Sequence, residues 1–128
     1  MAKITQLTVS AESKPGVLAR VSDTLAAAGV NIVAVCAADT AGRGKIRLVV
    51  SDPARAKEAL TAAKIRCGEE PALLLSMDDR PGALAAVASK LAAAKINLKC
   101  VYATASGGGQ AQVVVVVANP DKAERALA

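Results

Sequence analysis

The sequence predicts an α+β protein built from two βαββαβ units in tandem, each with an antiparallel sheet and its helices on one face. The chain repeats itself with a shift of 66 residues, and 11 of 22 positions are identical between residues 14–35 and 80–101. Each repeat also shows the same succession of strand-like and helix-like patterns. The length of 128 residues suits two small units, which we place at residues 1–69 and 70–128.

Each repeat begins with a predicted strand that leads into a helix. Residues 3–11 alternate between two faces, whereas residues 72–77 are apolar except for Ser76, as in a strand buried on both sides. A Pro-Gly pair follows each strand. In the first repeat Val17, Val21 and Leu25 then recur at helical spacing, and the second repeat shows the same pattern.

A β-hairpin is predicted next in each repeat. Residues 30–38 and 45–50 form the two strands of the first hairpin, with a glycine-containing turn between them. Residues 96–104 and 110–117 form the second, around Gly107–Gly109. This glycine run leads into a strand and not into a helix, so it indicates a hairpin tip, not a phosphate-binding loop.

A second helix closes each repeat. It begins at Pro53 after the N-cap Asp52, and at Pro120 after the N-cap Asn119. Residues 64–67 are then predicted to form a last strand, which gives the first unit the ferredoxin-like order 4-1-3-2. The second unit lacks its last strand, so its first strand is expected to present an open edge that pairs with the other repeat or another chain, unless the chain is truncated.

The composition argues against catalysis. The chain has no His, which is the commonest general base near neutral pH, and its three Cys show no CxxC spacing. It offers no nucleophile–base pair, metal cluster or phosphate loop. We therefore expect a protein that is not an enzyme and that needs no metal or cofactor.

The charge and hydropathy patterns argue against two classes of partner, nucleic acids and membranes. The net charge of +5 is spread evenly and Tyr102 is the only aromatic residue, which argues against nucleic-acid binding. The longest strongly apolar run, Val113–Ala118, is far shorter than the roughly 20 residues that span a bilayer. The N-terminus lacks the apolar stretch of a secretory signal. We expect a cytoplasmic protein that binds neither nucleic acid nor membrane.

The segments Asp79–Leu84 and Lys95–Leu98 resemble the ACT domain, and so do Ser13–Leu18 and Gly29–Ile32. The family pattern is an acidic residue, any residue, Pro-Gly, an aliphatic residue and Leu, followed by a helix that ends in a Gly-Ile/Val-Asn-Ile turn. The resemblance covers nearly the whole chain, twice over. It is greatest to small stand-alone proteins with two ACT repeats.

The resemblance implies a regulatory protein that binds an amino acid or a related small molecule at an ACT–ACT interface. A unit of about 60 residues is marginal alone, and this one has no Phe or Trp for its core, so we also expect a homodimer. An enzyme or regulator is expected as a further partner. The candidate ligand-binding residues are Ser13, Pro15, Gly16, Val17, Leu18, Asn31, Ile32, Asp79, Pro81, Gly82, Ala83, Leu84, Asn97 and Leu98.

The chemistry of the motif residues fits this implication. The N–H groups at a helix start suit a carboxylate, and Gly16 allows a ligand to approach closely. Simpler roles stay open: Pro-Gly sets the helix start, Asp79 caps the helix, and Asn31 and Asn97 hold turns. Because Ser13 departs from the acidic position of the family, the two sites are expected to differ.

Other functions stay open beside the sensor. The missing strand of the second repeat suggests an assembly module that oligomerises through sheet edges without a ligand. RNA-recognition domains share the predicted topology, but they read bases with aromatic residues that this chain lacks.

Overall fold

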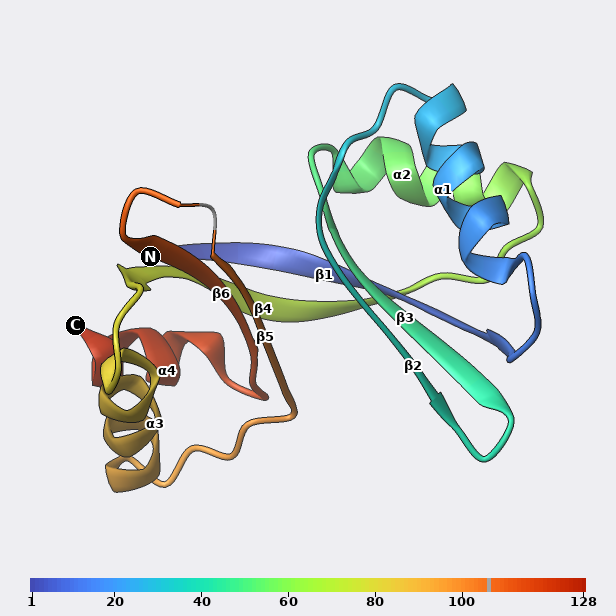
Figure 1. Cartoon of the computed structure of the whole chain (residues 1–128). Helices are drawn as coiled ribbons and strands as arrows, with labels where there is room; N and C mark the ends of the chain where they lie inside the picture. The colour runs from blue at the N-terminus through green and yellow to red at the C-terminus, as the bar shows by residue number, and fades with distance from the viewer. Residues whose placement is uncertain (106) are drawn as a thin grey trace. The chain divides into compact units, whose positions relative to one another are not determined.

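The computed structural model describes residues 1–105 and 107–128, and it confirms an α+β fold with two ferredoxin-like units (Figure 1). One compact unit contains Thr5–Glu70, and the other contains Met1–Ile4 together with Pro71–Ala128. The elements of the first repeat are β1 (Ala2–Glu12), α1 (Val17–Ala27), β2 (Ile32–Thr40), β3 (Arg43–Val50) and α2 (Pro53–Ala62). Those of the second are β4 (Gly68–Asp78), α3 (Ala83–Ala93), β5 (Cys100–Ala105), β6 (Gln110–Val116) and α4 (Pro120–Leu127).

In the unit Thr5–Glu70 the strands have the predicted order, with β4, β1, β3 and β2 as successive neighbours. Strand β3 is antiparallel to both β1 and β2. Leu7 of β1, Leu25 of α1 and Leu60 of α2 are fully buried in one apolar core. Alternate strand residues and the apolar stripes of both helices thus meet on a single face of the sheet.

The predicted strand at residues 64–67 is wrong, because α2 ends with a turn that continues into this segment. Lys64 adopts a left-handed conformation with φ 62°, and the Ile65 N–H donates to the carbonyl of Leu60 at 2.8 Å. Ile65 then inserts into the core instead of alternating along a strand. The fourth strand of this unit is the beginning of β4, where a Cβ on Gly68 would lie 2.9 Å from Thr8 Oγ1, so glycine permits the close approach to β1.

The unit of the second repeat orders its strands β4-β6-β5 and has a separate core that includes Leu73, Leu91 and Val115. It also contains Met1–Ile4, the start of β1, which is the other neighbour of β4. An exposed ion pair joins Lys3 of this segment to Asp121 of α4. The start of the chain thus takes the place of the missing fourth strand, and the expected open edge of β4 is covered.

Both second helices begin as predicted, with Asp52 and Asn119 accepting hydrogen bonds from backbone N–H groups of the first turn. The hairpin of the second repeat is shorter than predicted, because β5 starts only at Cys100 and residues 96–99 are not in a strand. Among the described residues, no helix is long and apolar enough to cross a bilayer.

Candidate functional site

The Pro-Gly loop of the first repeat connects β1 to the start of α1. Gly16 is the N-cap, with φ 93° and no side chain to cap the helix. The first turn of α1 carries no acidic residue. Since neither a side-chain cap nor a carboxylate satisfies the N–H groups of this turn, they favour an anion.

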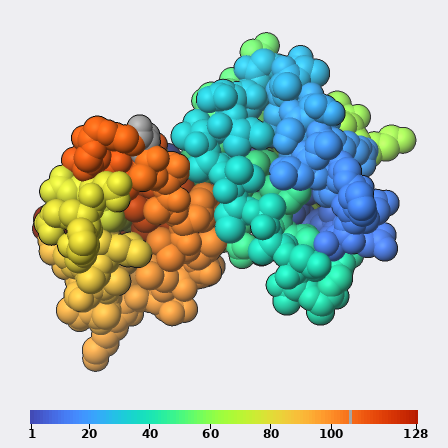
Figure 2. Space-filling model, viewed as in Figure 1, coloured from blue at the N-terminus to red at the C-terminus, as the bar shows by residue number. Residues whose placement is uncertain are grey.

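A hollow of about 230 Å³ lies between this loop and the β2–β3 hairpin, and we call it the hairpin pocket. The loop, the start of α1 and the hairpin tip share one exposed face of this unit (Figure 2, blue and teal). The predicted residues Ser13, Val17 and Leu18 line the pocket. Its lining residues are Ala11, Glu12, Ser13, Lys14, Val17, Leu18, Ala37, Ala38, Asp39, Gly44, Lys45 and Ile46.

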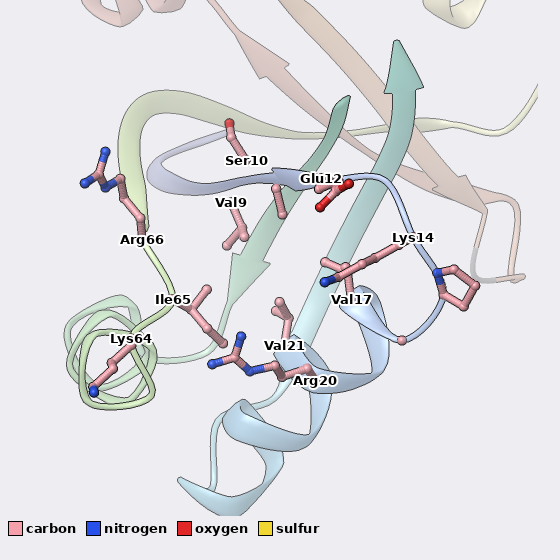
Figure 3. Close-up of a pocket in the computed structure, with 13 residues that line it drawn as sticks. Val9, Ser10, Glu12, Lys14, Val17, Arg20, Val21, Lys64, Ile65 and Arg66 are labelled. Atoms are coloured by element: carbon pink, nitrogen blue, oxygen red, sulfur yellow. The ribbon is translucent and has the colours of Figure 1, made fainter. Parts of the chain in front are cut away.

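A second hollow, of about 500 Å³, lies on the other side of the loop, and we call it the cationic pocket (Figure 3). It is bounded by β1, α1 and the segment after α2. The predicted residues Pro15, Gly16 and Val17 line it. Its lining residues are Val9, Ser10, Ala11, Glu12, Lys14, Pro15, Gly16, Val17, Arg20, Val21, Lys64, Ile65 and Arg66.

The two pockets differ in charge although they share Glu12 and Lys14. The hairpin pocket adds Asp39 and Lys45, so its charges are balanced. The Asp39 carboxylate accepts a hydrogen bond from the Gly42 N–H at 3.1 Å. In the cationic pocket, Arg20, Lys64 and Arg66 join Lys14 and leave Glu12 as the only acidic lining residue.

The structure does not bring Asn31 and Ile32 to the loop of their own repeat. Residue pairing places Ala11 opposite Gly44 at one end of β3 and Ile32 opposite Val50 at the other. At roughly 3.4 Å per residue these ends are about 20 Å apart. The Asn31 N–H donates to Ser51 Oγ and its carbonyl accepts from the Ser51 N–H, both at 2.9 Å, so its backbone holds a turn.

The loop of the second repeat has the same backbone but different surroundings. Gly82 is the N-cap of α3 with φ 89° and no side-chain cap, so Asp79 does not cap this helix. The preceding carboxylate, Asp78, accepts a hydrogen bond from Gln110 Nε2 at 2.8 Å and pairs with Arg80 Nε at 3.5 Å. The Asp78 carboxylate is therefore already hydrogen-bonded and ion-paired within the protein.

A hollow of about 160 Å³ in this unit is lined by Met1, Leu75, Ser76, Met77, Ala86, Val87, Lys90 and Leu127. The predicted loop residues Asp79, Pro81, Gly82, Ala83 and Leu84 are not among these lining residues. Leu98 packs against the core, and Asn97 is exposed at the opposite end of the hairpin, near the end of β6.

The charged residues around the first loop were missed by the motif comparison. Glu12 stands one residue before the family's acidic position, which Ser13 fills with a hydroxyl. Arg20 lies one turn into the helix, and Lys64 and Arg66 come from a distant segment. A search for charges beside the motif would have found Glu12 and Arg20, whereas Lys64 and Arg66 reach the pocket only through the fold.

The repeated βαββαβ unit with a Pro-Gly loop at each strand-to-helix turn defines a pair of ACT domains. The family model described as an ACT domain pair matches residues 2–128, and the chain belongs to this family. No curated protein matches the chain.

Solved structures extend this comparison. A crystal structure of a Bacteroides thetaiotaomicron protein is 33% identical with a TM-score of 0.91, and the match covers 98% of this chain and 86% of that one. The ligand-free regulatory subunit of aspartate kinase from Thermus thermophilus is 19% identical with a TM-score of 0.71, over 98% and 93% of the chains. At that identity the likeness shows the fold alone.

Proposed function

We propose that this chain is a non-catalytic regulatory protein that binds an amino acid in the hairpin pocket. The observation that carries this proposal is the balanced set of charges around that pocket, next to the uncapped start of α1. An amino acid presents an ammonium and a carboxylate together, so its site must supply both signs of charge within a few ångströms.

Each charge of such a ligand has a group to meet it. Glu12, the last residue of β1, is the acceptor for the ammonium, and among the described residues it takes part in no ion pair. The N–H groups of the first turn of α1 and the side chains of Lys14 and Lys45 favour the carboxylate. The volume of about 230 Å³ lies below the roughly 300–1,000 Å³ of typical ligand pockets, which suits a small ligand.

Regulation would follow from ordering the loop. A ligand held by β1, α1 and the hairpin joins three elements of one unit, and it favours whichever state of the chain presents them in this arrangement. The Thermus thermophilus protein of similar fold is itself a regulatory subunit. We propose that the responding equilibrium is a homodimer or a complex with an enzyme or regulator in the cytoplasm.

A second candidate function is assembly without a ligand. Strands β2 and β5 are edge strands, and they carry the exposed residues Val33, Val35 and Val101. If assembly is the function, light scattering will show an oligomer that Val33→Lys with Val35→Lys dissociates, and no amino acid will stabilise the protein.

A thermal-shift screen of the standard amino acids tests the sensor. We expect at least one amino acid to raise the unfolding midpoint, because a ligand that binds only the folded state stabilises it by mass action. Glu12→Gln should abolish that shift, and the matched variant Asp78→Asn should keep it. The absence of a shift from every amino acid would contradict the proposal.

A further inference from the structure

We infer that the cationic pocket is a second ligand site, for an organic anion that carries a carboxylate or phosphate on an apolar body. It lies on the opposite side of the loop from the hairpin pocket. The inference goes beyond the amino-acid sensor and stands even if no amino acid binds.

The floor of the pocket is apolar. Val9, Val21 and Ile65 are all buried members of the core of this unit, and Val17 packs against the same core. The pocket therefore opens directly onto core side chains. At about 500 Å³ it falls within the usual range for a bound small molecule, and such a floor fits an apolar ligand body.

The mouth of the pocket is positively charged. Figure 3 shows Lys14 and Arg20 reaching over it from the loop and from α1. Arg20 Nη2 donates to the Ala63 carbonyl at 2.6 Å, which fixes the guanidinium and leaves its other N–H groups for an anion. Among the described residues, no ion pair neutralises either cation.

The opposite wall adds two further cations. Lys64 and Arg66 line the pocket from the segment after α2, and Figure 3 shows their charged ends directed outward. They contribute to the positive potential that a ligand meets on entry. Lys64 adopts the left-handed conformation that glycine adopts without strain, with φ 62°.

The fold itself does not require such a pocket. In the second repeat, Met77 and Ala86 replace Ala11 and Arg20, and Met1 and Leu127 also line the hollow. The hollow there measures about 160 Å³, and Lys90 is the one charged side chain among its described lining residues. The large volume and the cationic mouth are therefore features of the first repeat alone.

Isothermal titration of the full chain at a fixed ionic strength of about 0.15 M tests this site. The probes are hexanoate and hexyl phosphate, with acetate and inorganic phosphate as head-group controls. We expect at least one of the hexyl probes to bind once per chain, at least about 10-fold more tightly than its head group, because added methylene groups are buried on the floor. The probe that binds more tightly identifies the head group as carboxylate or phosphate.

The variants Arg20→Gln and Lys64→Gly assign the binding to this pocket. We expect Arg20→Gln to weaken it about 10-fold, as for a lost charged hydrogen bond, and Lys64→Gly to weaken it several-fold. Lys64→Gly also removes backbone strain, so loss of binding cannot be attributed to unfolding. The matched control is Lys95→Gly, which removes the same charge from another left-handed position, just after α3, with φ 58°, and should leave binding unchanged.

Three results would overturn the site. They are no binding of either hexyl probe, equal affinity for the hexyl probes and their head groups, or equal losses in Lys64→Gly and Lys95→Gly. The last would mean that the probes sense only the net charge of the chain. Amino-acid binding is measured in a separate titration, with an amino acid as the probe, so either proposal can fail without the other.

Discussion

The two Pro-Gly loops of this chain start their helices in the same way but differ in chemistry. Gly16 and Gly82 both cap a helix in the left-handed conformation, with φ 93° and 89°. Beside the first, Glu12 enters no ion pair of the described residues, whereas Asp78 beside the second is held by Gln110 and Arg80. The motif thus sets the path of the chain, and its neighbours decide whether a ligand can use it.

The difference between the two loops begins with the residue that lies opposite each carboxylate in the neighbouring strand. Glu12 lies opposite Arg43 in β3, and its counterpart Asp78 lies opposite Gln110 in β6. The amide of Gln110 satisfies Asp78 with a bond of 2.8 Å. A carboxylate that already accepts such bonds gains little from a ligand ammonium, so we propose that Gln110 disfavours ligand binding at the second loop.

The largest expected effect comes from equivalent leucines of the two cores. Leu25 and Leu91 are 0% and 1% exposed, and truncating either to alanine should cost about 2–5 kcal/mol of unfolding free energy. Urea unfolding followed by circular dichroism measures this cost. Leu91→Ala should still bind the amino acid at temperatures where it is folded, whereas Leu25→Ala should bind it more weakly, because Leu25 supports α1. Equal losses of binding would contradict a site confined to the first loop.

The N-cap glycines give a smaller effect on stability and a sharper contrast in binding. Alanine at Gly16 or Gly82 meets no atom within 4 Å, but it must adopt a positive φ. Each change should therefore cost about 1–2 kcal/mol through backbone strain. Only Gly16→Ala should alter amino-acid affinity in a calorimetric titration. An effect of Gly82→Ala on that affinity would show that the second loop also takes part.

The smallest expected effect concerns the start of β1. The hydrogen bond and charge of Lys3 lower the pKa of Asp121, and Asp121 in turn raises the pKa of Lys3. A lowered carboxyl pKa contributes stability above its unfolded value of about 4, and this contribution is lost as the pH falls through the folded pKa.

Asp121→Asn should accordingly lower the unfolding midpoint slightly at pH 7, and the difference from the wild type should vanish at about pH 2. Both side chains are exposed, so the shift is small. Thermal unfolding across this pH range measures it. A difference that persists at the acid end would mean that the ion pair is not its cause.

Local signals predicted most of the fold. Asp52-Pro53 and Asn119-Pro120 specify their helix starts within two residues, and the structure confirms both. The strand predicted at residues 64–67 failed because Lys64 adopts a conformation typical of glycine, so the sequence carries no sign of the turn. The place of Met1–Ile4 depends on pairing with a strand far along the chain, which periodicity does not reveal.

The candidate site was predicted only as a loop. Pro15, Gly16, Val17 and Leu18 were found because the motif repeats, and they do line the pockets. The distance of Asn31 from this loop follows from strand register, which local sequence does not determine. The charges around the loop depend on which side chains the tertiary fold leaves unpaired.

Calorimetric titration with the amino acid that stabilises the wild type most is the direct test of a single amino-acid site at the first loop. We expect one binding site per chain, with affinity at least about 10-fold weaker in Glu12→Gln, as for a lost charged hydrogen bond, and unchanged in Asp78→Asn. Two sites per chain, or a loss of affinity in Asp78→Asn equal to that in Glu12→Gln, would show that both loops bind and would contradict it.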